Sequence, residues 1–578
     1  MQNLVNQSAF LPTSRKEMES LGWDNVDIIL FSGDAYVDHP SFGIAVIGRV
    51  LEAEGYRVAV VPQPNWLDDL RDFKKLGRPR LFFGVGSGNM DSMVNHYTAH
   101  KRLRSNDAYT PEGRSGARPD RAVTVYSQIL KKLYPDVPVV VGGIEASLRR
   151  LSHYDFWDDK WKPSVLSESG ADYLVYGMGE RAIKELAYKM RNRVGEKELK
   201  RTRQIAYMEH LSASLPQNVT ILNSYEACQG DIQSIIENTL LIEKESLKSD
   251  SLGLVEPVAD SFVVVNPPFP VMTSNELDAI YVLPFTRLPH PRYKDKDIPA
   301  YKMIKHSITL HRGCFGGCNF CALSAHQGKQ IVSRSEGSIL REVQNLNKLS
   351  NFKGVISDMG GPSANMYGMG GKDALLCSKC TRLSCLFPAI CTNLNHDHTR
   401  ITALYQAIEK VEGIRHAFIG SGIRYDLFLN QDGFYGRDGK EYFEQVMRRH
   451  TSGHFKVAPE HTEEHVLHYM GKPSYKLFER FKDFFDHLNS IEQLKLKIVP
   501  YFISSHPGCT DQDMDALSKK LQKNKMTVEQ IQDFTPTPLT RSSVMFYTKK
   551  ELKTQKEIFV AHSKSFKMRQ KSFFFKKK

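Results

Sequence analysis

The chain has 578 residues, enough for about two to four domains, and its 41% hydrophobic and 25% charged residues are ordinary for a soluble globular protein. It contains no run of about 18 apolar residues and no signal-peptide pattern at its start, so we expect a cytoplasmic protein with no membrane partner. The formal net charge of +13 is only a weak sign of nucleic-acid binding, because residues 549–578 hold eleven basic and two acidic residues.

Residues 1–195 are predicted to form the first domain. Strand patterns alternate with helical patterns there: strands are expected at 26–33, 57–61, 80–85, 137–141 and 171–176, and helices at 41–56 and 180–190. This alternation predicts an α/β fold with a doubly wound parallel sheet. Ligands of such sheets bind beyond the carboxyl ends of the strands.

A long polar segment, residues 95–121, separates the third and fourth predicted strands. A loop of that length inside a compact domain is either functional or disordered. Tyr97, Tyr109 and the interleaved arginines would suit a phosphate or nucleic-acid backbone. A solvated loop explains the same composition equally well.

The later domain boundaries are drawn from composition. Residues 196–299 are predicted to be a linker and subdomain, with a proline-rich boundary NPPFP at 266–270. Residues 300–548 form the predicted core, and residues 549–578 a basic, disordered tail. Cys228 is predicted to be an isolated buried thiol.

The core begins with a cysteine-rich loop, HRGCFGGCNFCAL at 311–323. Cys314, Cys318 and Cys321 have C-x₃-C-x₂-C spacing, and three thiolates on one loop can hold three irons of a cubic cluster. The fourth iron would then be open to a small molecule. Glycines in the loop let the backbone wrap a large inorganic group. Zinc is the alternative, although structural zinc sites take four ligands.

The spacing, the aromatic Phe320 before the last cysteine and the preceding strand resemble the cluster loop of radical S-adenosylmethionine (radical SAM) enzymes. The resemblance implies a 4Fe–4S cluster whose open iron binds the amino and carboxylate groups of SAM. It also implies an electron donor such as flavodoxin or ferredoxin, and cleavage of SAM to a 5′-deoxyadenosyl radical that modifies a substrate.

A helix is predicted at 335–349, followed by a strand at 355–358 and the turn Gly360-Gly361. The diglycine resembles the GGE motif that contacts the SAM amino group, with Pro362 in place of the acid and Asp358 as a substitute for it. A tight turn without a ligand is the alternative. Arg424 is predicted either to pair with the SAM carboxylate or ribose, or to form an ordinary ion pair.

A second cysteine group lies at 377–391, CSKCTRLSCLFPAIC. Cys377, Cys380, Cys385 and Cys391 have C-x₂-C-x₄-C-x₅-C spacing, which predicts a second metal site holding zinc or an iron–sulfur cluster. Four reduced, unliganded cysteines are the alternative.

Further strands are predicted at 416–420, 455–459 and 496–503, with helices at 439–449, 463–470 and 474–489. Repeated strand–helix units predict a partial (β/α) barrel whose active site lies at the carboxyl ends of its strands. The cluster loop, Arg424, residues 460–461 and residues 506–509 all fall at such ends.

Two further resemblances lie outside the loop that carries Cys314, Cys318 and Cys321. PVVVGGIEAS at 138–147 and ADYLVYGMGERAI at 171–183 are similar to the cobalamin-binding-like domain of many radical SAM enzymes. The cobalt-ligating signature Asp-x-His-x-x-Gly is altered, since Asp38 and His39 are adjacent, so we do not expect cobalamin. GGPSANMYG at 360–368 and DFTPTPLTRSSVMFYT at 533–548 resemble the YgiQ-like radical SAM family.

The expected function is therefore a radical SAM enzyme of unknown substrate. Segments such as VAPEHTEEHVLHYMGKP at 457–473 resemble methylthiotransferase-like radical SAM enzymes, which suggests RNA or a ribosomal component as the substrate. A small molecule or peptide is a second option. The alternative from another class is a non-catalytic iron–sulfur or zinc protein with a redox or interaction role.

Overall fold

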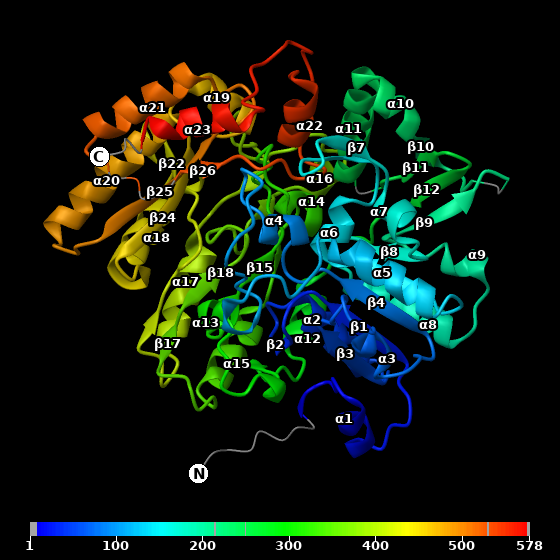
Figure 1. Ribbon diagram of the computed structural model, residues 1–578. Coiled ribbons are helices and arrows are strands. Elements are labelled where there is room, and N and C mark those ends of the chain that lie inside the picture. Colours follow the sequence, from blue (N-terminus) through cyan, green and yellow to red (C-terminus); the bar gives the residue numbers. More distant parts are fainter. Residues whose placement is uncertain (1–8, 213–214, 249, 527, 529–530, 575–578) are drawn as a thin grey trace. The chain divides into compact units, whose positions relative to one another are not determined.

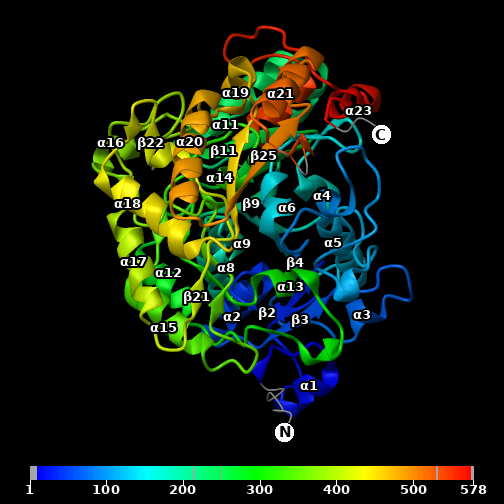
Figure 2. The same ribbon diagram turned by 90° about the vertical axis from the view of Figure 1, so that its left-hand side faces the viewer.

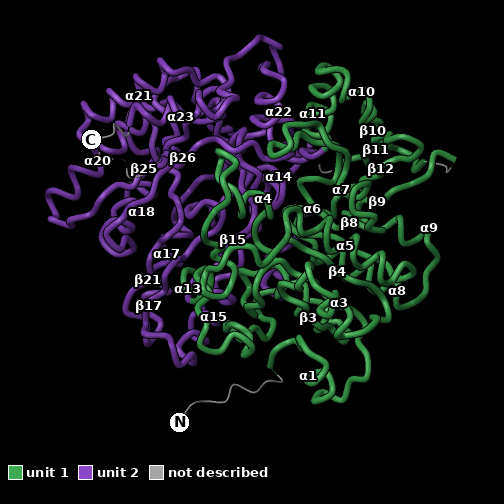
Figure 3. Tube along the Cα trace, viewed as in Figure 1, with its two compact units in different colours: residues 1–245, 251–270, 280–305 green, residues 246–250, 271–279, 306–578 purple. Residues whose placement is uncertain are grey.

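The computed structural model describes residues 9–212, 215–248, 250–526, 528 and 531–574 (Figure 1). The chain divides into two compact units, coloured separately in Figure 3. Unit 1 comprises residues 1–245, 251–270 and 280–305, and unit 2 comprises residues 246–250, 271–279 and 306–578.

Unit 1 is built on a nine-stranded sheet in the order β10-β11-β12-β9-β8-β5-β4-β1-β3. Its parallel part consists of the strands β1 (Ile28–Ser32), β3 (Val58–Pro62), β4 (Phe82–Gly86), β5 (Val139–Gly142) and β8 (Tyr173–Val175). Successive residues of β1 enter two separate apolar cores, because Ile28 and Leu30 belong to one and Ile29 and Phe31 to the other. A sheet with a core on each face is doubly wound, which confirms the predicted fold class.

Helices supply the outer layers of this sheet. They are α2 (Gly43–Ala53), α5 (Ala122–Leu133) and α8 (Glu180–Arg191). Tyr126 and Leu130 of α5 pack into the core of one face, and Leu186 of α8 packs into the core of the other. Because the helices cover the two faces of the sheet, the loops that can form a site lie at the carboxyl ends of the strands.

The sheet continues beyond the boundary expected at residue 195. The strands β9 (Ile205–His210), β11 (Gly253–Val258) and β12 (Ser261–Val265) join it in antiparallel pairs, and β10 (Val219–Ile221) adds a parallel edge. Residues 196–245 and 251–265, which lie in the predicted linker and subdomain, thus belong to unit 1. The physical reason is burial: without β9, the strand β8 would be an exposed edge.

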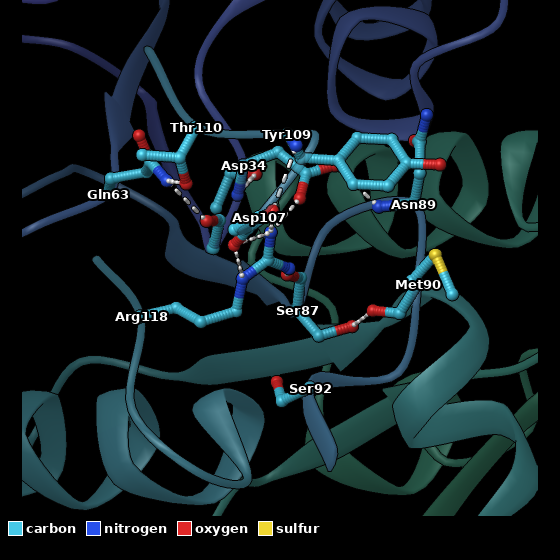
Figure 4. A network of polar contacts seen from close by, with 12 residues as sticks. Asp34, Gln63, Ser87, Asn89, Met90, Ser92, Asp107, Tyr109, Thr110 and Arg118 are labelled. Carbon is cyan, nitrogen blue, oxygen red and sulfur yellow. Dashed lines mark hydrogen bonds and ion pairs between the residues drawn. The ribbon is translucent and has the colours of Figure 1, made fainter. Parts of the chain in front are cut away.

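The loop 95–121 is tied down by Arg118, which lies at the carboxyl ends of β1 and β4 (Figure 4). Arg118 Nη2 is 2.8 Å from Asp34 Oδ1 and 3.0 Å from Asp107 Oδ2, and Nη1 donates to the Ser87 carbonyl at 2.8 Å. Burial raises the pKa of Asp34 to about 6, against the lowering effect of Arg118.

Within that loop, the two tyrosines expected to meet a phosphate backbone are used internally. The Tyr97 hydroxyl donates to Asp120 at 2.8 Å, and the Tyr109 ring packs edge-on against Phe42. The longest exposed stretch is residues 101–106, which includes Lys101, Arg102 and Arg104, and residues 114–116 are exposed as well. The loop is therefore ordered, and these short stretches are available to a partner.

Glu256 of β11 is buried in unit 1, where it accepts hydrogen bonds from the Ser152 N–H at 2.8 Å and from the Ser152 hydroxyl. Burial raises the pKa of Glu256 from 4.5 to about 7. A raised pKa in the folded state means that stability present below pH 4.5 is lost as the pH rises through 7.

We expect Glu256→Gln to raise the free energy of unfolding at pH 8 by up to about 3 kcal/mol and to change little at pH 4.5. The amide keeps one oxygen for the Ser152 N–H and can donate to its hydroxyl. Thermal unfolding from pH 4.5 to 8 measures the effect, with Asp260→Asn, an exposed carboxylate in the next turn, as the control. Equal pH dependence of the wild type and Glu256→Gln would contradict it.

Unit 2 contains parallel strand pairs followed by helices. The pairs are β14 (Ser307–Thr309) with β18 (Asp358–Gly360), β17 (Val355–Ile356) with β21 (His416–Ala417), and β24 (His454–Glu460) with β25 (Lys497–Ser504) and β26 (Gln532–Asp533). These pairs and their helices form the partial (β/α) barrel that the sequence predicts.

The helices that follow or cover these strands are α15 (Glu336–Leu346), α17 (Thr399–Glu409), α18 (Arg437–Gln445), α19 (Glu464–Met470), α20 (Tyr475–Ile491) and α21 (Asp511–Lys523). The helices α20 and α21 lie beside β25 in both views (Figure 2). Phe481 and Phe485 of α20 pack against Phe455 of β24. This aromatic packing fixes the strand whose end carries Glu460.

The tail does not match the expectation of disorder. It contains the helix α23 (Lys564–Ser572), in which Lys567 and Gln570 are buried. Gln570 accepts from the Ser505 N–H at 2.8 Å and donates to the Cys509 carbonyl at 2.8 Å. The last four residues, 575–578, lie outside the described residues. Among the described residues, none of the helices has the length and apolar character of a membrane span.

Candidate functional site

The cysteine-rich loop of unit 2 runs between β15 (His311–Arg312) and α14 (Leu323–Gln327). Cys314 is buried, whereas Cys318 and Cys321 are half-buried. The loop is closed by backbone hydrogen bonds from Cys314 N–H to the Gly328 carbonyl at 3.1 Å and from Cys321 N–H to the Cys318 carbonyl at 3.1 Å. The three predicted cluster ligands therefore lie on one folded loop.

The thiols of this loop influence one another. Burial, together with the smaller effect of the neighbouring Cys318, raises the pKa of Cys321 to about 12. Burial also raises the pKa of Cys314, while the positive charge of Arg424 opposes that rise. Such thiols stay protonated until a metal replaces the proton, so loading the site would release protons.

The donor set fits a cubic iron–sulfur cluster. Three thiolates complete three irons of a cubane but leave a structural zinc one ligand short. Within the described residues, no three His, Cys, Asp or Glu side chains lie close enough together to bind one metal ion. A cubane does not require that closeness, because each thiolate binds its own iron.

Arg424 lies directly beside the loop and is almost fully buried. Its Nε and Nη2 donate to the two oxygens of Asp426 at 3.1 and 2.6 Å, and its Nη1 is 3.5 Å from Cys318 Sγ. Arg424 is therefore at the site, as predicted, but two of its guanidinium nitrogens already donate to Asp426. The sequence reasoning missed Asp426, although an acid two residues after a buried arginine was a readable signal.

The glycine turn lies on the other side of the loop. A side chain at Gly361 would come within 2.6 Å of the His311 ring and 2.8 Å of the His311 carbonyl, so close packing alone requires glycine there. Asp358 accepts from the backbone N–H groups of Gly420 and Ser421 at 2.8 and 3.1 Å. Asp358 thus fastens the end of β18, and contact of Gly360 and Gly361 with SAM stays a prediction.

Phe320 anchors the loop beside the carboxyl end of β25, and its neighbour Asn319 anchors it to the last turn of α19. The Phe320 ring lies edge-on to His506, with centroids 6.2 Å apart. Asn319 donates to the Met470 carbonyl through its backbone and to the Tyr469 carbonyl through its side chain, both at 2.9 Å. Sequence reasoning missed Asn319.

Glu460 at the end of β24 has a backbone φ of +67°, which is strained for a residue with a side chain. It is buried, with Lys472 Nζ at 3.7 Å. Burial raises its pKa, and the positive charges of Lys472 and Arg424 oppose the rise. A strained carboxylate at a strand end, within electrostatic reach of Arg424 and Cys321, belongs to the same site.

The second cysteine group also lies against this loop. The Cys385 N–H donates to the Phe315 carbonyl at 3.0 Å, and the Ser384 hydroxyl donates to the Gly316 carbonyl at 2.6 Å. Cys377, Cys380 and Cys391 surround Cys385 in the same segment. The structure therefore brings together two cysteine groups that the sequence places more than fifty residues apart.

We expect Gly317→Ala to destabilise the loop by about 1–3 kcal/mol. Gly317 has a φ of +58°, and an added Cβ would lie 2.4 Å from the Leu383 carbonyl oxygen and 2.8 Å from Ser384 Cα. The amount of iron bound at this loop after anaerobic reconstitution should fall as well. Gly422→Ala is the matched control, because nothing lies within 4 Å of its Cβ position. Full iron loading of Gly317→Ala would contradict the expectation.

The chain is similar to known proteins of one family. The family model described as Radical SAM N-terminal matches residues 10–307. A UPF0313 protein of Bacteroides thetaiotaomicron is 53% identical over 582 residues, covering 98% of this chain and 94% of that protein. UPF0313 proteins of Porphyromonas gingivalis and Methanocella arvoryzae are 54% and 45% identical, covering 98% and 95% of this chain and 90% of each of those proteins.

Among solved structures, the radical S-adenosylmethionine methyltransferase TsrM from Kitasatospora setae has a TM-score of 0.49 at 14% identity, covering 89% of this chain and 74% of that one. The cobalamin-dependent S-adenosylmethionine radical enzyme OxsB has a TM-score of 0.47 at 11% identity, covering 93% and 56%. A second TsrM structure holds cobalamin and a [4Fe–4S] cluster. For the present chain, absence of cobalamin stays a prediction.

Proposed function

This chain belongs to the UPF0313 family of radical SAM proteins, and we propose from that premise that it is a cytoplasmic enzyme which binds a 4Fe–4S cluster through Cys314, Cys318 and Cys321. When bound, the cluster supplies the electron that cleaves SAM to methionine and a 5′-deoxyadenosyl radical, which removes a hydrogen atom from the substrate. The observation that carries the proposal is a single folded loop that presents three cysteines and no fourth.

The surrounding residues support this use of the loop. Arg424 places a positive charge 3.5 Å from Cys318 Sγ, and Asp426 holds the guanidinium in that position. Asn319 and Phe320 fix the loop against the end of α19 and against His506, which follows β25. These residues orient the ligands, and Glu460 and Lys472 give the adjacent strand ends a polar lining for a zwitterionic ligand such as SAM.

The direct test is anaerobic reconstitution of the full chain with iron and sulfide, followed by reduction in the presence of SAM. We expect about four irons and four sulfides per chain at this loop and release of 5′-deoxyadenosine that depends on the reductant. Reduced flavodoxin or ferredoxin should replace the chemical reductant. A cubane that never releases 5′-deoxyadenosine, or zinc alone at the loop, would leave the non-catalytic metal-binding protein as the better description.

We propose RNA or a ribosomal component as the substrate class. The support is the exposed basic stretch 101–106 in unit 1 together with the basic residues of α23. The modified-nucleoside mass profile of RNA from a deletion strain should lose a component. An unchanged RNA profile with accumulation of a small metabolite would favour a small-molecule substrate instead.

A further inference from the structure

The four cysteines of the second group lie in a closed excursion of unit 2, residues 372–393, which we call the cysteine loop. Its base is the antiparallel pair β19 (Gly370–Gly371) and β20 (Leu394–Asn395). Asp373 and Asn393 clamp the base further, because the Asp373 N–H donates to Asn393 Oδ1 and Asn393 Nδ2 donates to the Asp373 carbonyl, both at 2.9 Å. The loop is thus one structural element with defined ends.

The cysteine loop has almost no core of its own. The structure describes this stretch without a gap, and Ser384 and Leu386 are its only buried residues. Leu375 and Leu376 are 75% and 61% exposed. Ordering each residue costs about 1–2 kcal/mol of conformational entropy, which two buried side chains do not offset. Segments this small usually depend on disulfides or a metal to stay folded.

The four thiols lie in one short loop. Cys385 is within electrostatic reach of Cys377, Cys380 and Cys391, and all four are free thiols. N–H groups also point at the sulfurs: the Arg382 N–H lies 3.4 Å from Cys380 Sγ, and Asn393 Nδ2 lies 3.3 Å from Cys377 Sγ. Outer partners of this kind orient sulfurs as metal ligands.

We propose that Cys377, Cys380, Cys385 and Cys391 together bind a second metal centre, an iron–sulfur cluster, which folds the cysteine loop and braces the loop that carries Cys314, Cys318 and Cys321. Each of the four thiolates would bind its own iron, whereas no three metal-binding side chains of the described residues lie close enough together for one zinc ion. The second centre therefore has no open position for SAM. Its role is structural, and this inference does not require that the protein cleave SAM.

The bracing follows from the contacts between the two loops. Cys385 N–H and the Ser384 hydroxyl donate to the carbonyls of Phe315 and Gly316, next to the first cysteine group. Leu386 and Phe315 share one small apolar cluster with Cys314. Lys329, which follows the first loop, reaches the Arg382 carbonyl and lies 3.7 Å from Cys380 Sγ. If the cysteine loop unfolds, the first loop loses these partners.

The test measures metal content in a chain whose first site is disabled. The full-length Cys318→Ala protein, purified without air, should retain iron together with sulfide at the second site. The triple variant Cys318→Ala/Cys377→Ala/Cys385→Ala should lose it. Cys228→Ala in place of the two second-site changes is the control, because Cys228 is a buried thiol in unit 1. Iron together with sulfide supports the proposal, and zinc without sulfide would contradict it.

Limited trypsin digestion provides a readout that does not depend on metal analysis. Lys372, Lys379 and Arg382 lie in the cysteine loop, so Cys377→Ala/Cys385→Ala should be cleaved there at least tenfold faster than the wild type. The same double variant should bind less iron at the first site. Unchanged first-site iron would overturn the bracing.

Two results would overturn the second centre itself: Cys318→Ala protein without any metal, or one whose four loop cysteines are joined as disulfides. Release of 5′-deoxyadenosine tests the proposed function separately. A wild-type chain that holds the second metal but releases no 5′-deoxyadenosine would reject SAM cleavage and leave the second centre in place.

Discussion

Replacing Cys318 with alanine should leave the chain folded, remove most of the iron and sulfide of the first loop, and abolish release of 5′-deoxyadenosine. Two remaining thiolates cannot hold a cubane firmly. Loss of even an outer partner of a ligand costs about tenfold to a hundredfold in metal affinity, so loss of the ligand itself should cost at least as much. Cys318 Sγ also lies 3.5 Å from Arg424 Nη1, so the variant removes this contact as well.

The measurement is iron and sulfide per chain after reconstitution, with 5′-deoxyadenosine quantified by mass spectrometry. Cys228→Ala serves as the control, since it removes a buried thiol from unit 1 and should keep full cluster content and activity. Unaltered thermal unfolding would show that Cys318→Ala is folded. Wild-type iron content in Cys318→Ala would mean that a different set of ligands holds the cluster.

The loop that carries Cys314, Cys318 and Cys321 was predictable because the pattern that identifies it is local. Three cysteines and the glycines around them lie within eight residues, and that spacing decides which metal group they can hold. The parallel strands of unit 1 were predictable for a similar reason, because strands buried on both faces read as continuous apolar runs.

What the sequence did not reveal depends on contacts between distant segments. The hydrogen bond from Ser384 to Gly316 spans 68 residues, and no local pattern indicates it. The strands β9 to β12 fall in the stretch predicted to be a linker and subdomain, and their place in the sheet was not readable because short edge strands gain their stability from the neighbour with which they pair. The helix α23 was hidden by its basic composition, since its order depends on Gln570 reaching Ser505 and Cys509.

Changing Arg118 to methionine should lower the free energy of unfolding of unit 1 by about 3–5 kcal/mol, the usual cost of breaking a buried ion pair by removing one partner. The guanidinium of Arg118 is fully buried between Asp34 and Asp107 (Figure 4). Without it, two carboxylates stay buried with no cation between them. The loop 95–121 should also open, because Arg118 is the residue that ties it to the Ser87 carbonyl.

The pH dependence separates this charge effect from a simple loss of packing. The pKa of Asp34 is already raised to about 6 by burial, and removal of Arg118 should raise it further. The variant should therefore lose stability as the pH rises from 5 to 8, while Arg118→Met/Asp34→Asn should recover part of the loss at pH 8. Calorimetry and hydrogen exchange over residues 95–121 measure both effects, with the exposed Arg102→Met as the control. A loss that is equal at pH 5 and pH 8 would show that Arg118 acts through packing alone.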